Sequence, residues 1–180
     1  MTCFARGFYD EDYGCTCPSL DRWYACPLEP EPKPEDFMTE ENCMKVVLDD
    51  GAYMPEKAHR ADAGYDLRTP KRVVLRRGES ACIDTGVHIA IPEGWYGKLE
   101  SKSGLNVKHS IVSLGGVIDS SYTGSIVAKL YNFGNEDYVF EAGDKVIQIV
   151  FMQCGNFSLT QVDELEETDR GDNGFGSSGK

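Results

Sequence analysis

The sequence predicts an all-β protein, and three observations carry that prediction. Short runs rich in β-branched and aromatic residues recur from residue 44 onward. Turn sequences such as RRGES, IPEGW, FGNED and EAGDK separate these runs. No stretch shows sustained 3.6-residue periodicity. Several short strands with regular turns are typical of an antiparallel sandwich or barrel.

Each strand is expected where such a run occurs. The runs are MKVVL (44–48), RVVL (72–75), ACIDTGVHIAI (81–91), WYGKLES (95–101), SIVAKLYNF (125–133), DYVF (137–140) and VIQIVFM (146–152). SGLNVKHSI (103–111) is the one stretch that could form a short helix. In the run 81–91, side chains at alternate positions share one face of a strand, which places together Ile83, Thr85, Val87, Ile89 and Ile91. Cys82 and Cys154 are expected to be small buried hydrophobes.

The composition divides the 180 residues unevenly. Residues 1–43 hold five of the seven cysteines, five of the eight prolines, and ten acidic against three basic residues. Within them, PLEPEPKPEDF reads as an extended linker stiffened by proline. We therefore expect an N-terminal appendage and linker over 1–43, a β body over 44–168, and a glycine- and serine-rich arm over 169–180.

Two interpretations of the appendage stay open. Cys3, Cys15, Cys17 and Cys26 could bind zinc, although their uneven gaps do not match a CxxC ligand pairing. Alternatively, the segment is unstructured or bound to a protein partner. Six aromatic residues lie among these cysteines, which is more than a purely solvated segment needs.

The net charge of −12 argues against a nucleic-acid partner, because phosphate backbones are bound by surplus lysine and arginine. It leaves room for a small phosphorylated ligand, which needs only a few local cations and a metal ion. No apolar run approaches the roughly 20 residues of a membrane helix, and the acidic start does not resemble a secretory signal. We expect a cytoplasmic protein with reduced thiols and no membrane partner.

The last eleven residues, RGDNGFGSSGK, pose a separate question. Glycine and serine suit a loop that wraps around phosphate oxygens, and Arg170 would add a forked cation. A frayed terminus is the alternative, but it gives no role to the aromatic ring of Phe175.

Four further segments are unusual for a plain sandwich, and each also has an ordinary explanation. Asp66 in AGYDL could pair with Arg68, and Lys102 in KLESKSG could be a solvated surface charge. In GGVIDSSYTG, Asp119 could stabilise a turn and Tyr122 could be a half-buried strand residue. Gln148, inside the apolar run of GDKVIQIV, could bond to a strand edge.

Taken in order, the five segments resemble the five motifs of the trimeric dUTPase (deoxyuridine 5′-triphosphate nucleotidohydrolase) family. AGYDL is similar to the first, EGWYGKLESKSG to the second, GGVIDSSYTG to the third, GDKVIQIV to the fourth and RGDNGFGSSG to the fifth. The resemblance covers the body from about residue 44 to the end and none of residues 1–43. It implies a β-sandwich or jelly-roll homotrimer whose C-terminal arm crosses to another subunit and closes over the nucleotide.

The resemblance implies hydrolysis of dUTP to dUMP and pyrophosphate by water attack on the α-phosphorus, which keeps uracil out of DNA and supplies dUMP for thymidylate synthesis. By the same resemblance, Asp119 orients and deprotonates the water. Tyr122 lies under the deoxyribose and excludes a 2′-hydroxyl, and backbone groups around Gly115 and Gly116 read the uracil edge.

The remaining implied roles concern phosphate, base and metal. Mg²⁺ is held by the phosphate oxygens, with Asp66 binding one of its waters in the outer shell. The body would bind substrate through Lys102, Ser103, Gly104 and Gln148. The arm would bind it through Arg170, Gly176, Ser177 and Ser178, while Phe175 stacks on the uracil.

Two positions depart from the family pattern. Lys102 stands where the family usually has arginine, which keeps the charge but loses the bidentate fork. Ser121 stands where an aspartate commonly precedes the tyrosine.

Two rival functions remain. A dCTP deaminase of the same fold would need a catalytic glutamate near the pocket and would lack the complete tail motif. A regulatory or binding protein built on a dUTPase body would use residues 1–43 for its partner.

Overall fold

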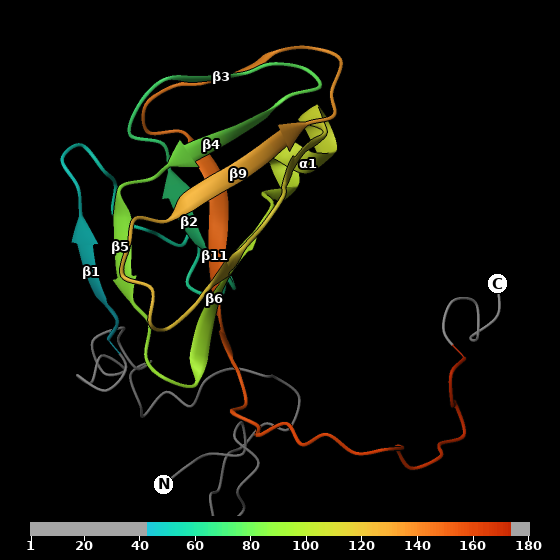
Figure 1. Ribbon diagram of the computed structural model, residues 1–180. Coiled ribbons are helices and arrows are strands. Elements are labelled where there is room, and N and C mark those ends of the chain that lie inside the picture. Colours follow the sequence, from blue (N-terminus) through green and yellow to red (C-terminus); the bar gives the residue numbers. More distant parts are fainter. Residues whose placement is uncertain (1–42, 174–180) are drawn as a thin grey trace, which may run out of the picture. The chain divides into compact units, whose positions relative to one another are not determined.

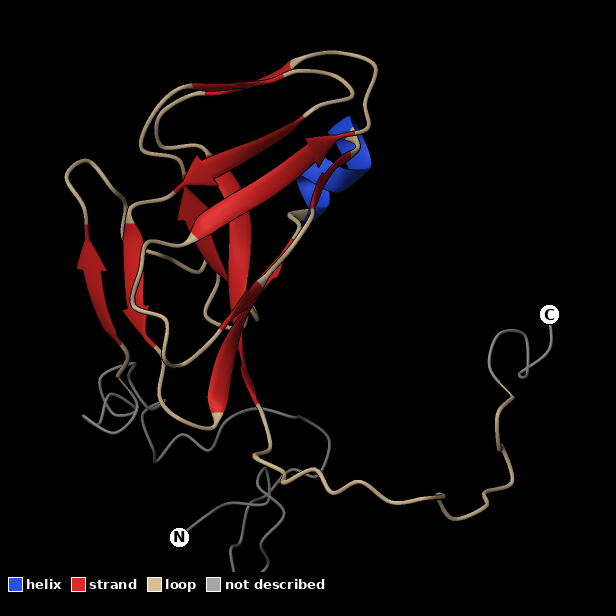
Figure 2. Ribbon diagram, in the orientation of Figure 1, coloured by secondary structure: helices blue, strands red, loops and turns tan. Residues whose placement is uncertain are grey.

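The computed structural model describes residues 43–173. In this part of the chain, strands dominate and one short helix is present (Figure 2). The all-β prediction is confirmed. The four N-terminal cysteines singled out above lie outside the described residues, as do Phe175, Gly176, Ser177 and Ser178.

The described elements follow one another along the chain in this order (Figure 1): β1 (Lys45–Leu48), β2 (Tyr65–Arg68), β3 (Val73–Leu75), β4 (Ser80–Asp84), β5 (Val87–Ala90), β6 (Trp95–Glu100), α1 (Ser103–His109), β7 (Ile111–Ser113), β8 (Val117–Ile118), β9 (Val127–Asn132), β10 (Tyr138–Phe140) and β11 (Lys145–Gln153).

These strands form four small sheets. A four-stranded sheet has the order β2-β11-β6-β8, and a three-stranded sheet has the order β4-β9-β7. The pairs β1-β5 and β10-β3 complete the set. All pairings within the two larger sheets are antiparallel.

Each predicted run contains a strand, and the predicted helix is α1. The run 81–91, however, is two strands and not one. Gly86 adopts a φ of 66° between β4 and β5, a conformation that glycine reaches without steric cost. The chain therefore changes partner there, from β9 beside β4 to β1 beside β5.

The hydrophobic core lies between the sheets and follows the predicted alternation. Ile83, Thr85 and Val87 are fully buried, and Ile89 and Ile91 are nearly so. The largest side chains that are completely buried come from the sheets and from the segment before β9: Leu67, Leu75, Ile83, Ile111, Ile126, Leu130, Phe140, Ile147 and Ile149.

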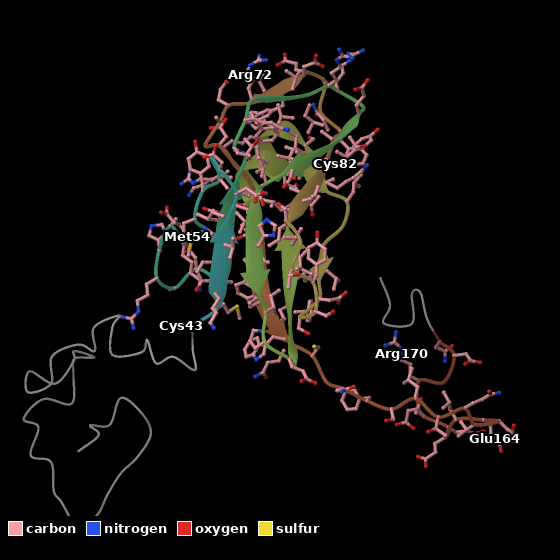
Figure 3. All side chains as sticks on the ribbon, turned by 60° about the vertical axis from the view of Figure 1, so that its left-hand side comes forward. Cys43, Met54, Arg72, Cys82, Glu164 and Arg170 are labelled. Carbon is pink, nitrogen blue, oxygen red and sulfur yellow. The ribbon has the colours of Figure 1, made fainter. Side chains whose placement is uncertain are left out.

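The prediction for two cysteines is wrong. Cys82 and Cys154 are both exposed, and Figure 3 shows Cys82 on the folded body. Because Ile83 points into the core, its neighbour in an extended strand must point the other way. Cys154 follows directly after the end of β11, where the chain leaves the sheet.

The chain divides into two compact units, residues 1–45 and 46–180. The division into appendage, body and arm by role stays a prediction. In the described part, no helix is long and apolar enough to span a membrane.

Adjacent positions on β4 test this alternation. Ile83→Ala should lower the free energy of unfolding by about 2–5 kcal/mol, because it empties a fully buried site. Cys82→Ala, one residue away on the exposed face, should change it by less than about 0.5 kcal/mol. Urea unfolding followed by circular dichroism measures both values. Equal losses from the two substitutions would contradict the placement of these faces.

Candidate active site

Strand β11 brings three segments that are distant in sequence into one row. Its residue Gln148 pairs in register with Asp66 on β2 and with Glu100 on β6. The Gln148 side chain donates a hydrogen bond to the carbonyl of Ser101 at 3.2 Å. The first, second and fourth motifs therefore meet in the middle of the four-stranded sheet.

An ion cluster is centred on Asp66, the buried carboxylate of this row. Asp66 is only 5% exposed, and its two carboxylate oxygens contact two different ammonium groups. Lys102 pairs with one oxygen, and Lys145 Nζ lies 2.6 Å from the other. A buried carboxylate needs such partners, because an unpaired charge in the interior is strongly destabilising.

The two cations decide the ionisation of this carboxyl. Burial alone would raise the pKa of Asp66, but hydrogen bonds and charge attraction from Lys102 and Lys145 outweigh it, so the pKa is lowered. Asp66 is consequently a carboxylate at neutral pH, and it holds both ammonium groups in place.

The second motif continues from β6 into helix α1. Lys102 has extended backbone angles and immediately precedes the helix, and its carbonyl accepts a hydrogen bond from Asn106 N at 2.9 Å. Ser103 and Gly104 form the exposed first turn, while Leu105 anchors the helix in the core. The Ser103 hydroxyl therefore faces solvent and directly follows Lys102 of the ion cluster.

The third motif forms a turn between β8 and β9. Tyr122 N donates to the Asp119 carbonyl at 3.0 Å, and the Tyr122 hydroxyl donates to the Ser125 carbonyl at 2.9 Å. Within residues 43–173, the exposed Asp119 carboxylate makes no hydrogen bond or ion pair with the protein. It is thus free to accept a proton or to hold a water molecule.

The glycine before this turn has a steric requirement. Gly116 O accepts a hydrogen bond from Leu99 N at 2.7 Å. A Cβ at Gly116 would lie 2.8 Å from the Leu99 carbonyl oxygen, closer than nonbonded atoms approach. This close backbone pairing of β6 with the segment before β8 leaves no room for a side chain.

The fifth motif is described only at its start. Arg170 is exposed, and its Nε donates to the Asn173 carbonyl at 3.0 Å within a tight turn. The remaining arm residues of the prediction lie outside the described part.

Of the ordinary explanations for the motif residues, those for Asp66, Lys102 and Tyr122 are wrong, and the one for Asp119 holds for its backbone. Asp66 does not pair with Arg68, whose guanidinium donates to the Gly143 carbonyl and lies 3.9 Å from Glu56. Lys102 is not a free surface charge, and Tyr122 lies in a turn and not in a strand. The backbone of Asp119 does stabilise its turn, but its side chain stays free for another role.

Lys145 was not predicted from the sequence as a site residue. It stands in the quoted GDKVIQIV segment, but its contact with Asp66 depends on the pairing of β11 with β2. A bulge between Lys145 and Ile147 shifts that register, and nothing local in the sequence indicates it.

The donor set fits a cation held mainly by a ligand. No cluster of three or more His, Cys, Asp or Glu side chains suited to a metal occurs in residues 43–173. Asp66 engages two of the roughly four acceptor positions of a carboxylate, so it retains capacity for a water. This fits an outer-shell role better than a protein cage.

Two half-buried lysines paired with a buried carboxylate, an exposed hydroxyl and a free carboxylate on an all-β body are chemically suited to a phosphorylated ligand. The dUTPase family profile matches residues 50–179. A probable dUTP nucleotidohydrolase of Schizosaccharomyces pombe is 39% identical over 132 residues, which are 73% of this chain and 94% of that protein. The mouse enzyme is 38% identical over 135 residues, 75% and 83% of the two chains.

Solved structures agree with this match. The dUTPase of Staphylococcus bacteriophage 80alpha with dUPNHPP gives a TM-score of 0.73 at 33% identity, over 77% of this chain and 99% of that chain. A mutant dUTPase from phage phi11 with a structural Mg(II) ion gives 0.65 at 32%, over 70% and 100%. The chain belongs to the dUTPase family.

The ion cluster predicts a specific acid sensitivity. Because the pKa of Asp66 is lowered, its contribution to stability is present above its ordinary pKa and is lost as pH falls through the lowered value. Lys145→Met removes one of the two cations, so the pKa of Asp66 should rise and acid unfolding should begin at a higher pH. The loss at neutral pH should be about 1–2 kcal/mol, between an exposed and a buried ion pair.

Arg72→Met is the matched control, since Arg72 pairs with Glu141 at 3.2 Å on the surface. It should leave the acid midpoint unchanged. Tryptophan fluorescence followed from pH 7 to pH 2 measures both variants, and an unchanged midpoint for Lys145→Met would refute the role of this lysine.

Proposed function

We propose that this protein hydrolyses dUTP to dUMP and pyrophosphate as a magnesium-dependent homotrimer, which would keep uracil out of DNA and supply dUMP for thymidylate synthesis. The observation that carries the proposal is the contrast between two carboxylates of the family motifs. Asp66 is buried and held by two lysines, whereas Asp119 is exposed and unpartnered within the described residues.

Asp119 is the proposed general base. Its carboxylate would accept a proton from the water that attacks the α-phosphorus, and holding that water in line lowers the entropy cost of attack. A base needs an oxygen that no protein group occupies, and the Asp119 oxygens have no protein partner within residues 43–173.

Lys102, Ser103 and Gln148 are proposed to bind the phosphates. Lys102 supplies positive charge, and the exposed Ser103 hydroxyl and the Gln148 amide supply hydrogen-bond donors. Mg²⁺ bound to the triphosphate would neutralise its charge. Asp66 would hold one water of that ion while it keeps Lys102 oriented.

Tyr122 is proposed to exclude ribonucleotides. Its side chain is 44% exposed, and its hydroxyl is tied to the Ser125 carbonyl, so the ring has a fixed orientation. A ring held in this way can fill the space that a 2′-hydroxyl needs. The Gly115–Gly116 backbone would meet the uracil edge.

The separation of the two halves of the site supports association of the chain with further copies. Asp119 comes one position after Ile118, which pairs with Gly97 on β6. Gln148 on β11 pairs with Glu100, further along the same strand β6. This is a difference of four positions along the strand, about 13 Å at 3.3 Å per residue. A water cannot contact Asp119 and a phosphate beside Gln148 across that distance, which favours completion of the site by a second subunit.

Exposed apolar side chains also support association. Val117 and Phe133 are 66% and 65% exposed on the body. In the segment after β11, Phe157 and Leu159 are 83% and 96% exposed. Contact with neighbouring subunits would cover such surfaces, and an arm that crosses to a neighbour would carry Arg170 toward its phosphates.

The first test is pyrophosphate release from dUTP with Mg²⁺, compared with dCTP, dTTP and UTP. We expect turnover confined to dUTP. Asp119→Asn should lower kcat by about 10²–10⁴-fold, the usual contribution of a general base. Asp50→Asn, at another exposed aspartate, should leave kcat unchanged. A folded trimer without turnover on dUTP would overturn the proposal.

Sugar selectivity tests the role of Tyr122. Tyr122→Ala should lower the preference for dUTP over UTP in kcat/KM by about tenfold or more, because the space for a 2′-hydroxyl opens. Tyr122→Phe keeps the ring but loses the hydrogen bond to Ser125, and it should retain most of the preference. Unchanged selectivity in the alanine variant would exclude a steric role for the ring.

A further inference from the structure

A histidine on β5 contacts the turn that carries Asp119 and Tyr122. We call residues 119–126 the catalytic turn. His88 Nδ1 lies 2.8 Å from the Thr123 carbonyl oxygen in the middle of this turn. Its Nε2 lies 3.3 Å from Oδ1 of Asp49, which follows β1. The imidazole therefore bridges the catalytic turn and the body.

The far end of the turn is fixed independently. Ile126 is buried, its N–H donates to the Val87 carbonyl at 2.9 Å, and its carbonyl accepts from Thr85 at 2.7 Å. Ser125 Oγ donates to the Asp84 carboxylate. His88 thus contacts the turn at Thr123, which is nearer to Tyr122 in sequence than the anchored residues Ser125 and Ile126 are.

The two contacts of His88 require two protons on the ring. A carbonyl oxygen only accepts hydrogen bonds, and an ionised carboxylate also only accepts them. The imidazolium has two N–H donors and satisfies both partners. Neutral imidazole has one, so either Thr123 or Asp49 then faces a nitrogen lone pair.

We propose that His88 is a positioning residue whose imidazolium form ties the catalytic turn to Asp49 and thereby holds Asp119 and Tyr122 for catalysis. Loss of one ring proton loosens the turn, and His88 itself does not contact the substrate. The effect on catalysis rests on the proposed function, whereas the tether itself does not.

The surroundings favour the protonated form. The hydrogen bond to Thr123 is the largest cause of the raised pKa of His88. Desolvation opposes the rise, and the hydrogen bond and charge of Asp49 and the charge of Asp84 add to it. Asp49 and Asp84 are the charged groups that face the ring, and Lys71 in turn acts on Asp84. Because the pKa is raised, the tether is complete in mildly acidic solution and is lost as pH rises through the raised value, above about 6.5.

The activity-independent test is an NMR titration of the full-length protein from pH 5.5 to 9. The backbone amide signals of Thr123 and Ser125 should change with the same midpoint as the His88 ring. His88→Gln should abolish this change. Asp49→Asn should move the midpoint to lower pH, because the negative charge that favours the imidazolium is lost. Amide signals that do not follow the His88 ring would overturn the tether.

The catalytic test compares kcat for dUTP across the same pH range. The ratio of the wild-type kcat to the kcat of His88→Gln should be about three- to tenfold at pH 6, which corresponds to the free energy of one hydrogen bond. This ratio should approach one at pH 8.5. His59→Gln is the matched control, since His59 Nδ1 lies 3.5 Å from Asp62 on another loop, and its ratio should stay near one throughout.

The outcomes separate the two proposals. A ratio that is equal at every pH would mean a merely structural role and would overturn the positioning role of His88. Turnover of dUTP without the amide titration overturns the tether and leaves the proposed function intact. The amide titration in a protein that does not hydrolyse dUTP supports the tether and refutes the proposed function.

Discussion

The pairing of β11 with β2 and β6 is the constraint on which the site depends. It places Asp66, Gln148 and Glu100 in one row, and a slip of one residue would turn each side chain to the opposite face. Gly64 accommodates this pairing, because a Cβ there would lie 2.5 Å from the Gln148 side-chain oxygen. The register that buries Ile147 and Ile149 in the core therefore also aligns the groups that we propose to bind phosphate.

Charge pairing explains how an acidic protein can keep cations ready for a phosphorylated ligand. The chain carries a net charge of −12, yet two ammonium groups converge on the single buried carboxylate of Asp66. Asp66 offsets their mutual repulsion and fixes their positions before any ligand arrives. Groups that are oriented in advance need little reorganisation when charge develops during a reaction.

The fold was largely predictable because strand periodicity is a local property. Alternation from Ile83 to Ile91 determined which side chains enter the core, and the turn sequences separated the strands. The cysteine prediction failed because residue type was given more weight than the period: with Ile83 inward, Cys82 had to point outward. The contact of Lys145 with Asp66 depends on long-range register and on a bulge, so local patterns could not reveal it.

Burial and pairing also distinguish the proposed roles of the two motif carboxylates. Asp66 cannot readily serve as a base, because the two lysines bound to its oxygens lower its pKa. Asp119 lies on a turn that is anchored at Ile126 and tethered through Thr123, and its oxygens have no protein partner in residues 43–173. A rigid sheet suits the carboxylate that orients cations, whereas a base must meet water. The exposed turn therefore supports the assignment of proton transfer to Asp119, and its tethers explain how an exposed group can still be held in position.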